Sequence, residues 1–168
     1  MNAHSSILRA ATLDDRYLAP SGPVFMNGTQ ALVRLTMLQA ERDRAAGLNP
    51  AGFVSGYRGS PLGAVDSAFA GAKKHWQPLG IRFHHGLNED LAATSIIGTQ
   101  QVGLYGPARV DGVFALWYGK GPGVDRAGDA IHHGNAYGSS AKGGVLLAAG
   151  ADHLAKSSTT AHQSEYAL

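Results

Sequence analysis

The sequence contains no cysteine among its 168 residues. It therefore offers no disulfide, no thiolate metal site and no cysteine ligand for an iron–sulfur cluster. Long hydrophobic runs are missing too, because no apolar stretch approaches the roughly 18 residues that cross a bilayer. Residues 1–17 contain acids and lack the apolar centre of a signal peptide. We accordingly expect a soluble, cytoplasmic protein without a membrane partner.

An excess of charge of one sign is also missing. The 14 Lys and Arg residues barely outnumber the 12 Asp and Glu residues, which gives a formal net charge of +2. The densest charged stretch, residues 41–44, alternates in sign as the solvated face of a helix does. Because no run of Lys or Arg occurs, we do not expect nucleic acid as a partner.

Glycine is the residue present in excess, with 23 copies. The glycines have no three-residue period, which excludes a collagen-like chain, and they gather at the ends of apolar runs, where tight turns need them. Hydrophobic residues make up 44% of the chain and charged residues 15%, so disorder is not expected. The length suits one domain with a sizeable core.

Apolar runs and helical patterns alternate along the chain. The apolar runs predict strands at residues 52–57, 80–85, 111–119 and 143–152. Amphipathic patterns predict helices at residues 27–47, with Asn27 as the N-cap and Gly47 at the stop, and at 64–76 and 88–106. This alternation predicts an α/β fold whose mostly parallel sheet is covered by helices on both faces.

The remaining segments are less regular. Residues 1–22 are predicted to be an N-terminal arm or linker, and residues 120–140 a glycine-rich loop with a weak helix. Residues 23–168 would form the domain. A helix-start signal, Ser and Thr followed by Gln and Glu, lies within residues 155–168. We therefore expect this domain to be truncated at its C-terminal end and the chain to be the N-terminal part of a larger protein.

Ligands of open α/β sheets bind outside the carboxyl ends of the strands. Here these ends are polar, glycine-rich or both, at residues 55–63, 84–90, 118–125 and 149–158. Their clustering predicts a pocket. It does not by itself name a reaction, because each stretch also has a purely structural interpretation.

Three sequence features have both a functional and a structural interpretation. Glu89 and Asp90 suit the first turn of a helix, whose dipole favours acids, or one of them is a catalytic acid. The stretch "GKGPGVD" suggests phosphate binding, but it lacks both the P-loop pattern and G-x-G-x-x-G. The His84–His85 and His132–His133 pairs suggest a metal; adjacent strand residues point in opposite directions and H-E-x-x-H is absent, so we predict no metal site.

Four segments in order resemble the N-terminal region of indolepyruvate:ferredoxin oxidoreductases, in particular the long fused bacterial form. This family belongs to the 2-oxoacid:ferredoxin oxidoreductases. The segments read "VSGYRGSPLGAVD", "GLNEDLAAT", "YGKGPGVDRAGDAI" and "GADHLAKSSTTAHQSE". The resemblance covers about residues 24–168. It implies a pyrimidine-binding (Pyr) domain for thiamine diphosphate.

The resemblance can be carried over residue by residue. The family turn G-Y-P-G-T-P matches Gly56-Tyr57-Arg58-Gly59-Ser60-Pro61, with Arg58 in place of the usual Pro and Ser60 in place of Thr. The N-E pair matches Asn88-Glu89, and the loop K-x-x-G-[LV]-[ND] matches Lys120, Gly123, Val124 and Asp125. The family segment H-S-S-Q-N-E-Q is met loosely by Lys156-Ser157-Ser158 through Glu165, across a polar insertion.

These matches imply roles. Glu89 would be the catalytic acid that hydrogen-bonds the N1′ nitrogen of the cofactor's aminopyrimidine ring, while Asp90, about 100° away around the helix, would cap it. The cofactor-binding residues would be Glu89, Gly56, Tyr57, Gly59, Ser60 and Pro61. Ser60, Arg58 and Lys120 would face the substrate. Two alternatives remain open: Arg58 as a solvent-facing residue and Lys120 as a subunit contact.

The implied reaction is the oxidative decarboxylation of indolepyruvate or another arylpyruvate to an acyl-coenzyme A, with electrons passed to ferredoxin. Mg²⁺, the diphosphate and an iron–sulfur cluster would be held outside this segment, by a PP domain of the same polypeptide or a second subunit. The full protein would be a homo-oligomer, and this segment alone would be inactive. The alternatives are a non-catalytic Pyr-like assembly module, an inactive fragment, or a nucleotide-phosphate binder.

Overall fold

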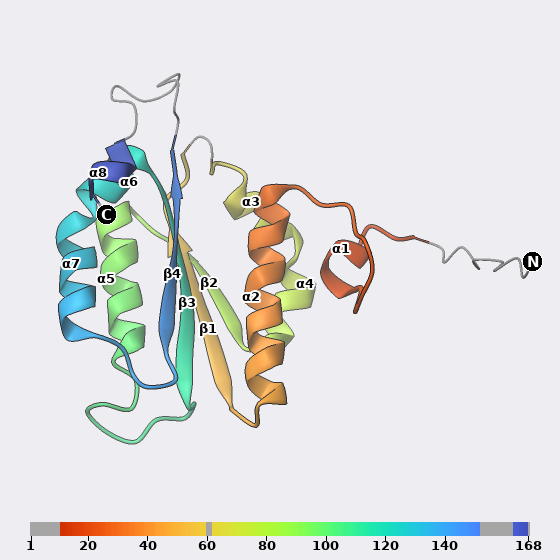
Figure 1. The fold of residues 1–168 in the computed structure, drawn as a ribbon, viewed down its shortest axis with the longest axis horizontal. Coiled ribbons are helices and arrows are strands. Elements are labelled where there is room, and N and C mark those ends of the chain that lie inside the picture. Colours follow the sequence, from red (N-terminus) through yellow and green to blue (C-terminus); the bar gives the residue numbers. More distant parts are fainter. Residues whose placement is uncertain (1–10, 60–61, 152–162, 168) are drawn as a thin grey trace, which may run out of the picture.

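The computed structural model describes residues 11–59, 62–151 and 163–167. Its centre is a four-stranded sheet in the order β2-β1-β3-β4, in which all neighbouring strands are parallel. The strands are β1 (Pro50–Gly56), β2 (Ile81–His85), β3 (Gly112–Lys120) and β4 (Gly144–Gly150). The predicted parallel sheet is confirmed (Figure 1).

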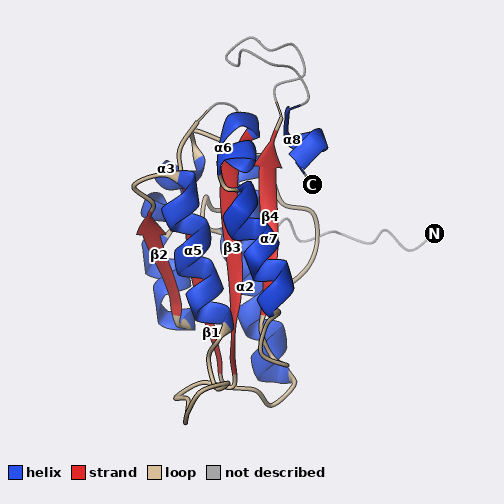
Figure 2. Cartoon of the chain, turned by 90° about the vertical axis from the view of Figure 1, so that its left-hand side faces the viewer, coloured by secondary structure: helices blue, strands red, loops and turns tan. Residues whose placement is uncertain are grey.

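Helices cover both faces of the sheet, as predicted (Figures 1 and 2). One face carries α2 (Gly28–Ala45), α3 (Val65–Gly71) and α4 (Lys73–Trp76), which continues into the short 3-10 helix η1 (Gln77–Leu79). The other carries α5 (Glu89–Gln100) and α7 (Gly128–Tyr137). At the carboxyl ends of the strands lie α6 (Gly121–Arg126) and α8 (Gln163–Ala167). Within the described ranges, no helix combines the length and the apolar character needed to cross a bilayer.

The alternation of side chains along β3 builds two cores, one on each face of the sheet. Leu116 and Tyr118 face α2 and α3 and pack in a cluster that includes Met37 and Phe69. Ala115 and Trp117, which alternate with them along the strand, face α5 and α6 and pack with Ala92, Ile96 and Val124. A central strand buried on both faces explains why residues 112–119 read as an almost continuous apolar run.

Truncating the central strand is expected to test this packing. Leu116 is 1% exposed, and Leu116→Ala removes buried methyl groups and leaves a cavity. We expect the variant to lose about 2–5 kcal/mol of unfolding free energy, measured by urea denaturation. The matched control is Leu87→Ala, because Leu87 is 83% exposed, and it is expected to change stability by less than about 0.5 kcal/mol. Equal effects of the two variants would contradict the assigned core.

The ends of α2 follow the sequence signals. The Asn27 side chain accepts a hydrogen bond from the Gln30 backbone N–H at 2.9 Å, and the Gln30 side chain accepts one from the Asn27 N–H at 3.0 Å. This reciprocal capping box satisfies two N–H groups that the first turn leaves unpaired. Gly47, with φ +82°, follows the helix in the left-handed region that favours glycine. The predicted N-cap and stop are confirmed.

Three predictions of helical structure are wrong in detail. Residues 120–140 form α6 and α7 rather than a loop with one weak helix, because Pro122 suits the first turn of α6 and its buried face packs into the core. The helix predicted at 64–76 divides into α3 and α4; the Trp76 indole N–H donates to the Phe69 carbonyl at 2.7 Å there. Finally, α5 ends at Gln100 instead of 106, ahead of Gly103 with φ +82°.

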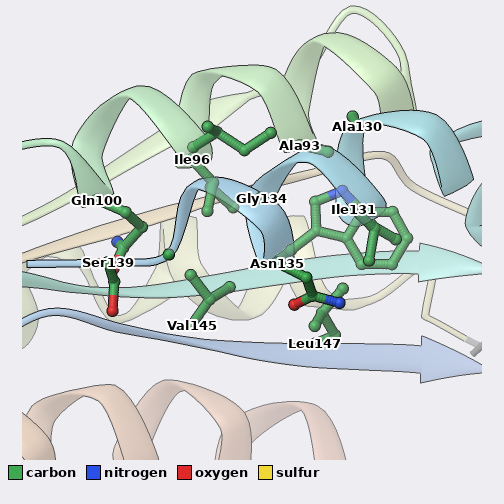
Figure 3. A pocket seen from close by; sticks show the side chains of 13 residues that line it. Ala93, Ile96, Gln100, Ala130, Ile131, Gly134, Asn135, Ser139, Val145 and Leu147 are labelled. Atoms are coloured by element: carbon green, nitrogen blue, oxygen red, sulfur yellow. The ribbon is translucent and has the colours of Figure 1, made fainter.

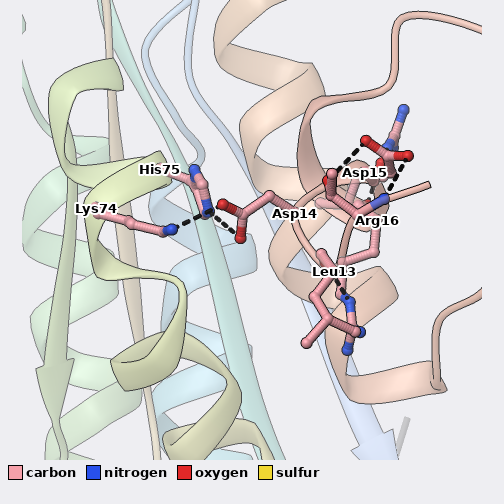
Figure 4. Close-up of polar contacts among 8 residues, drawn as sticks. Leu13, Asp14, Asp15, Arg16, Lys74 and His75 are labelled. Atoms are coloured by element: carbon pink, nitrogen blue, oxygen red, sulfur yellow. Dashed lines mark hydrogen bonds and ion pairs between the residues drawn. The ribbon is translucent and has the colours of Figure 1, made fainter. Parts of the chain in front are cut away.

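The described part of the predicted N-terminal arm packs on the domain. It contains the short helix α1 (Asp15–Leu18), beside α2. Asp14 accepts a hydrogen bond from Lys74 on α4 at 2.7 Å and lies 3.2 Å from the His75 ring nitrogen (Figure 4). The hydrogen bond from Lys74, and then that from His75, holds the pKa of the Asp14 carboxyl below its ordinary value of 3.8. Arg34 of α2 also donates to the backbone carbonyls of Asp15, Arg16 and Ala19.

Candidate functional site

The order of the strands fixes where a ligand would bind. From β1 the chain crosses to β2 on one side and then to β3 on the other, so that the direction of winding reverses between β1 and β3. In open α/β sheets a crevice forms outside the carboxyl ends of the strands at such a switch point. Here this edge carries the turn after β1, the loop between β2 and α5, and α6 (Figure 1).

Backbone hydrogen bonds hold these segments together. The Gly86 N–H donates to the Gly56 carbonyl at 3.0 Å, and the Tyr57 N–H donates to the Tyr118 carbonyl at 3.1 Å. The turn also reaches the end of β3, since a Cβ on Gly59 would lie 3.4 Å from the Cβ of Lys120. The described residues of the predicted turn, 56–59, and Lys120 are thus neighbours at one edge of the sheet.

Glu89 is the first residue of α5 and is half-buried at this edge. Its backbone carbonyl accepts a hydrogen bond from the Trp117 indole N–H at 3.2 Å, which ties the start of the helix to β3. Its side chain lies on Gly123 of α6: a Cβ there would be 2.5 Å from Glu89 Cγ and 2.6 Å from Oε1. Among the described residues no hydrogen-bond donor is found for the Glu89 carboxylate. The site therefore holds a packed carboxylate that can bind a ligand group.

The residues on either side of Glu89 have other tasks. The Asn88 side chain accepts a hydrogen bond from the Leu91 N–H at 2.8 Å and caps α5. Asp90 accepts a hydrogen bond from Arg126 of α6 at 3.0 Å. The capping role predicted for Asp90 is therefore wrong. Asn88 occupies the N-cap position, from which its side-chain oxygen reaches an N–H group that the first turn leaves unpaired, whereas Asp90 lies inside the helix and links α5 to α6.

The other predicted residues divide into three groups. Tyr57 and Arg58 are exposed, whereas Lys120 is half-buried at the end of β3. Ser60, Pro61 and residues 156–158 lie outside the described residues. Gln163 of α8 donates to Asp125 of α6 at 2.8 Å, which places the described end of the fourth segment beside α6. The segments at residues 56–59, 86–89, 120–125 and 163–165 thus border the same edge.

A hydrogen-bonded cluster that the sequence analysis missed lies at this edge on the α3 side. The Tyr118 hydroxyl donates to Asp66 Oδ1, and His85 Nδ1 lies 3.1 Å from Asp66 Oδ2. Burial above all, and then the hydrogen bond and charge of Asp66, raise the pKa of Tyr118 well above its usual range, so this hydroxyl stays protonated. The signal in the sequence is that His85 and Tyr118 each lie at or near the end of a predicted strand.

A separate cavity of about 240 Å³ lies between α5, α7, β3 and β4 (Figure 3). Its walls are mainly apolar, with Ile96 and Ile131 on the helices and Val145 and Leu147 on β4, and polar groups from Gln100, Asn135 and Ser139. Its lining includes none of the predicted site residues. Elsewhere in the described ranges, no group of three or more His, Asp or Glu residues is placed to hold a metal ion.

Comparisons with known proteins do not assign the chain to a family. No protein-family model matches the sequence, and searches of curated proteins and of solved structures find no significant similarity. The class that the geometry defines is a parallel, doubly covered α/β domain with a carboxylate at the switch-point edge of its sheet.

Proposed function

We propose that this chain is the pyrimidine-binding domain of a thiamine-diphosphate-dependent oxidoreductase that decarboxylates arylpyruvates such as indolepyruvate and passes electrons to ferredoxin. The observation that carries the proposal is the position of Glu89. It starts α5 at the switch-point edge and lies directly on Gly123, with no protein donor for its carboxylate among the described residues. The order of the four segments in the sequence supports the same family.

The residues present fit an aminopyrimidine ring. A flat heterocycle needs a carboxyl group held in one place and a wall to which it can pack closely. Gly123 has no side chain, so the Glu89 side chain can lie directly on the backbone of α6. The buried side chains of Val124 and Ala92 make the surroundings apolar. A low local dielectric strengthens a hydrogen bond between a carboxyl group and a ring nitrogen. The α5–α6 junction therefore suits this ring.

When bound, thiamine diphosphate supplies the carbon nucleophile for a 2-oxo carbonyl group. Within this chain Glu89 would hold a proton in the hydrogen bond to N1′ of the ring, which favours the imino form of the ring. The Trp117 indole fixes the start of α5 through the Glu89 carbonyl, so the carboxylate is positioned by β3 as well as by α6. The turn with Tyr57 and Arg58 would contact the substrate, with Lys120 beside it.

The proposed reaction needs parts that this chain does not contain. The diphosphate and Mg²⁺ would be held by a PP domain. The iron–sulfur cluster would be held by a cysteine-containing segment, because this chain has no cysteine. Coenzyme A and ferredoxin would act as acyl and electron acceptors. The complete site would then form where the carboxyl edge of this sheet meets the PP domain.

Binding of the cofactor tests the proposal directly. The material is the native assembly, purified through an affinity tag on this chain and freed of bound cofactor. Calorimetry with thiamine diphosphate and Mg²⁺ is expected to show saturable binding, whereas ATP with Mg²⁺ is expected to show none. Binding of ATP but not of thiamine diphosphate would favour the hypothesis that residues 118–125 bind the phosphates of a nucleotide. Binding of neither ligand would favour a non-catalytic assembly module.

A further inference from the structure

Asp66, His85 and Tyr118 form a cluster at the carboxyl edge that the proposed function does not yet use. Asp66, in the first turn of α3, is hydrogen-bonded to both of the other side chains. His85 and Tyr118 both pair with Gly56, so they flank it in one register row across the sheet. A Cβ on Gly56 would lie 2.6 Å from the Tyr118 ring. Glycine at this position therefore leaves the space that the Tyr118 ring occupies.

The cluster fixes the orientation of the His85 ring. Its Nδ1 is engaged by Asp66, and the Phe83 ring packs against the His85 ring in a T-shaped arrangement with ring centroids 4.7 Å apart. The Asp66 side chain is 16% exposed, whereas the His85 side chain is 65% exposed. Asp66 is in turn anchored by the buried Tyr118. Because Asp66 engages Nδ1 and most of the His85 side chain is exposed, we take Nε2, the second ring nitrogen, as the atom that can meet a ligand.

The charges around His85 favour an anion as its ligand. Lys73 of α4 lines a groove together with His85. Arg82 and His84 border the same groove from the opposite face of β2, so they are not counted among the groups that face His85. Asp66 is the acid that contacts His85, and it already accepts from two donors. A protonated His85 would therefore present a charge-assisted Nε2–H donor in a groove that also holds the Lys73 ammonium group. The loop that follows His85 is bound to Gly56 and leads directly to Glu89.

We propose that His85, held by Asp66 and Tyr118, donates a hydrogen bond from Nε2 to the carboxylate of the 2-oxoacid substrate. Asp66 and Tyr118 are positioning residues in this arrangement. The inference rests on the proposed function for the identity of the acid. In the neutral ring with its proton on Nδ1, Nε2 is an acceptor and faces the carboxylate with a lone pair. Binding of the acid should therefore weaken as His85 loses its proton.

The test uses phenyllactate, which keeps the aryl group and carboxylate of an arylpyruvate but has no carbonyl carbon to attack. Its affinity for the native assembly loaded with thiamine diphosphate is measured by calorimetry between about pH 5 and 8, where histidines titrate. The wild type is expected to bind more weakly as the pH rises. His85→Gln is expected to bind about tenfold more weakly or worse at the low end and to lose the pH dependence.

The matched control is His84→Gln. His84 is the adjacent exposed histidine, and its side chain points to the opposite face of β2. This variant should bind phenyllactate as the wild type does. The proposal is overturned if His85→Gln retains the affinity and pH profile of the wild type, if both variants weaken binding equally, or if phenyllactate does not bind the wild type. Thermal unfolding of each variant confirms that the fold is kept.

Inorganic phosphate, added at constant ionic strength, separates a substrate carboxylate from a cofactor phosphate as the anion. If phosphate displaces phenyllactate from the wild type but not from His85→Gln, the site is a phosphate site and the carboxylate assignment is wrong. Failure of the proposed function shows differently: the assembly then does not bind thiamine diphosphate, whatever the result with phenyllactate.

Discussion

Replacing Glu89 by glutamine is expected to lower arylpyruvate-dependent reduction of ferredoxin by the native assembly about 10²–10⁴-fold, the range typical of a lost acid–base group. Glutamine has nearly the same shape as glutamate, so the side chain can still lie on Gly123. Its amide cannot hold a transferable proton for the N1′ nitrogen of the cofactor ring. The measurement is kcat at saturating thiamine diphosphate and Mg²⁺, with 2-oxoacid and coenzyme A also in excess.

The neighbouring acid provides the control for this prediction. Asp90 lies in the same first turn of α5, but its carboxylate accepts a hydrogen bond from Arg126. Asp90→Asn removes one acidic charge from the helix start and is expected to keep turnover within a few-fold of the wild type. If Asp90→Asn is as damaging as Glu89→Gln, the two acids act through the helix or the fold. If Glu89→Gln turns over normally, both are ordinary charges of a helix start.

The second large effect is expected from Gly123→Ala. The added methyl group would occupy space that the Glu89 side chain now fills, 2.5 Å from its Cγ and 2.6 Å from Oε1. The carboxylate must then move, and a misplacement of about 1 Å can cost on the order of 100-fold in rate. We expect turnover to fall by this amount, with a loss of about 1–3 kcal/mol in unfolding free energy from overpacking.

Gly128→Ala is the matched control, because this glycine is also in a helix and no atom lies within 4 Å of the position of its Cβ. Turnover should be unchanged, and stability should be unchanged or slightly higher. A crystal structure of Gly123→Ala would show the displaced carboxylate. Normal turnover by Gly123→Ala with Glu89 demonstrably shifted would contradict the requirement for a fixed carboxylate.

The sheet could be predicted from the sequence because its signals are local and repeated. Residues 112–119 are apolar on both faces, as a central parallel strand requires. Polar, glycine-rich stretches mark the ends of the strands, and the helical patterns between the strands predict parallel connections. The N-cap at Asn27 was visible for the same reason, since a capping box spans only four residues. The edge that carries the candidate site follows from the parallel topology.

The two helices at residues 121–137 could not be predicted from local propensity. Glycine lowers helix propensity, and this segment contains several glycines. The reason for one of them lies elsewhere in the chain: Gly123 makes room for Glu89. The partners of Asp66 could not be predicted for a similar reason. His85 and Tyr118 are far apart in the sequence, and they lie together because both pair with Gly56 in the sheet.

The central claim is that the Glu89 carboxyl group binds the N1′ nitrogen of thiamine diphosphate. The most direct measurement is the ¹⁵N NMR chemical shift of N1′-labelled thiamine diphosphate bound to the native assembly, for the wild type and for Glu89→Gln. We expect the wild type to show the shift of a protonated or strongly hydrogen-bonded nitrogen, and the variant to return it toward the value of the free cofactor. The same N1′ shift in both proteins, or no bound cofactor in the wild type, would contradict the account.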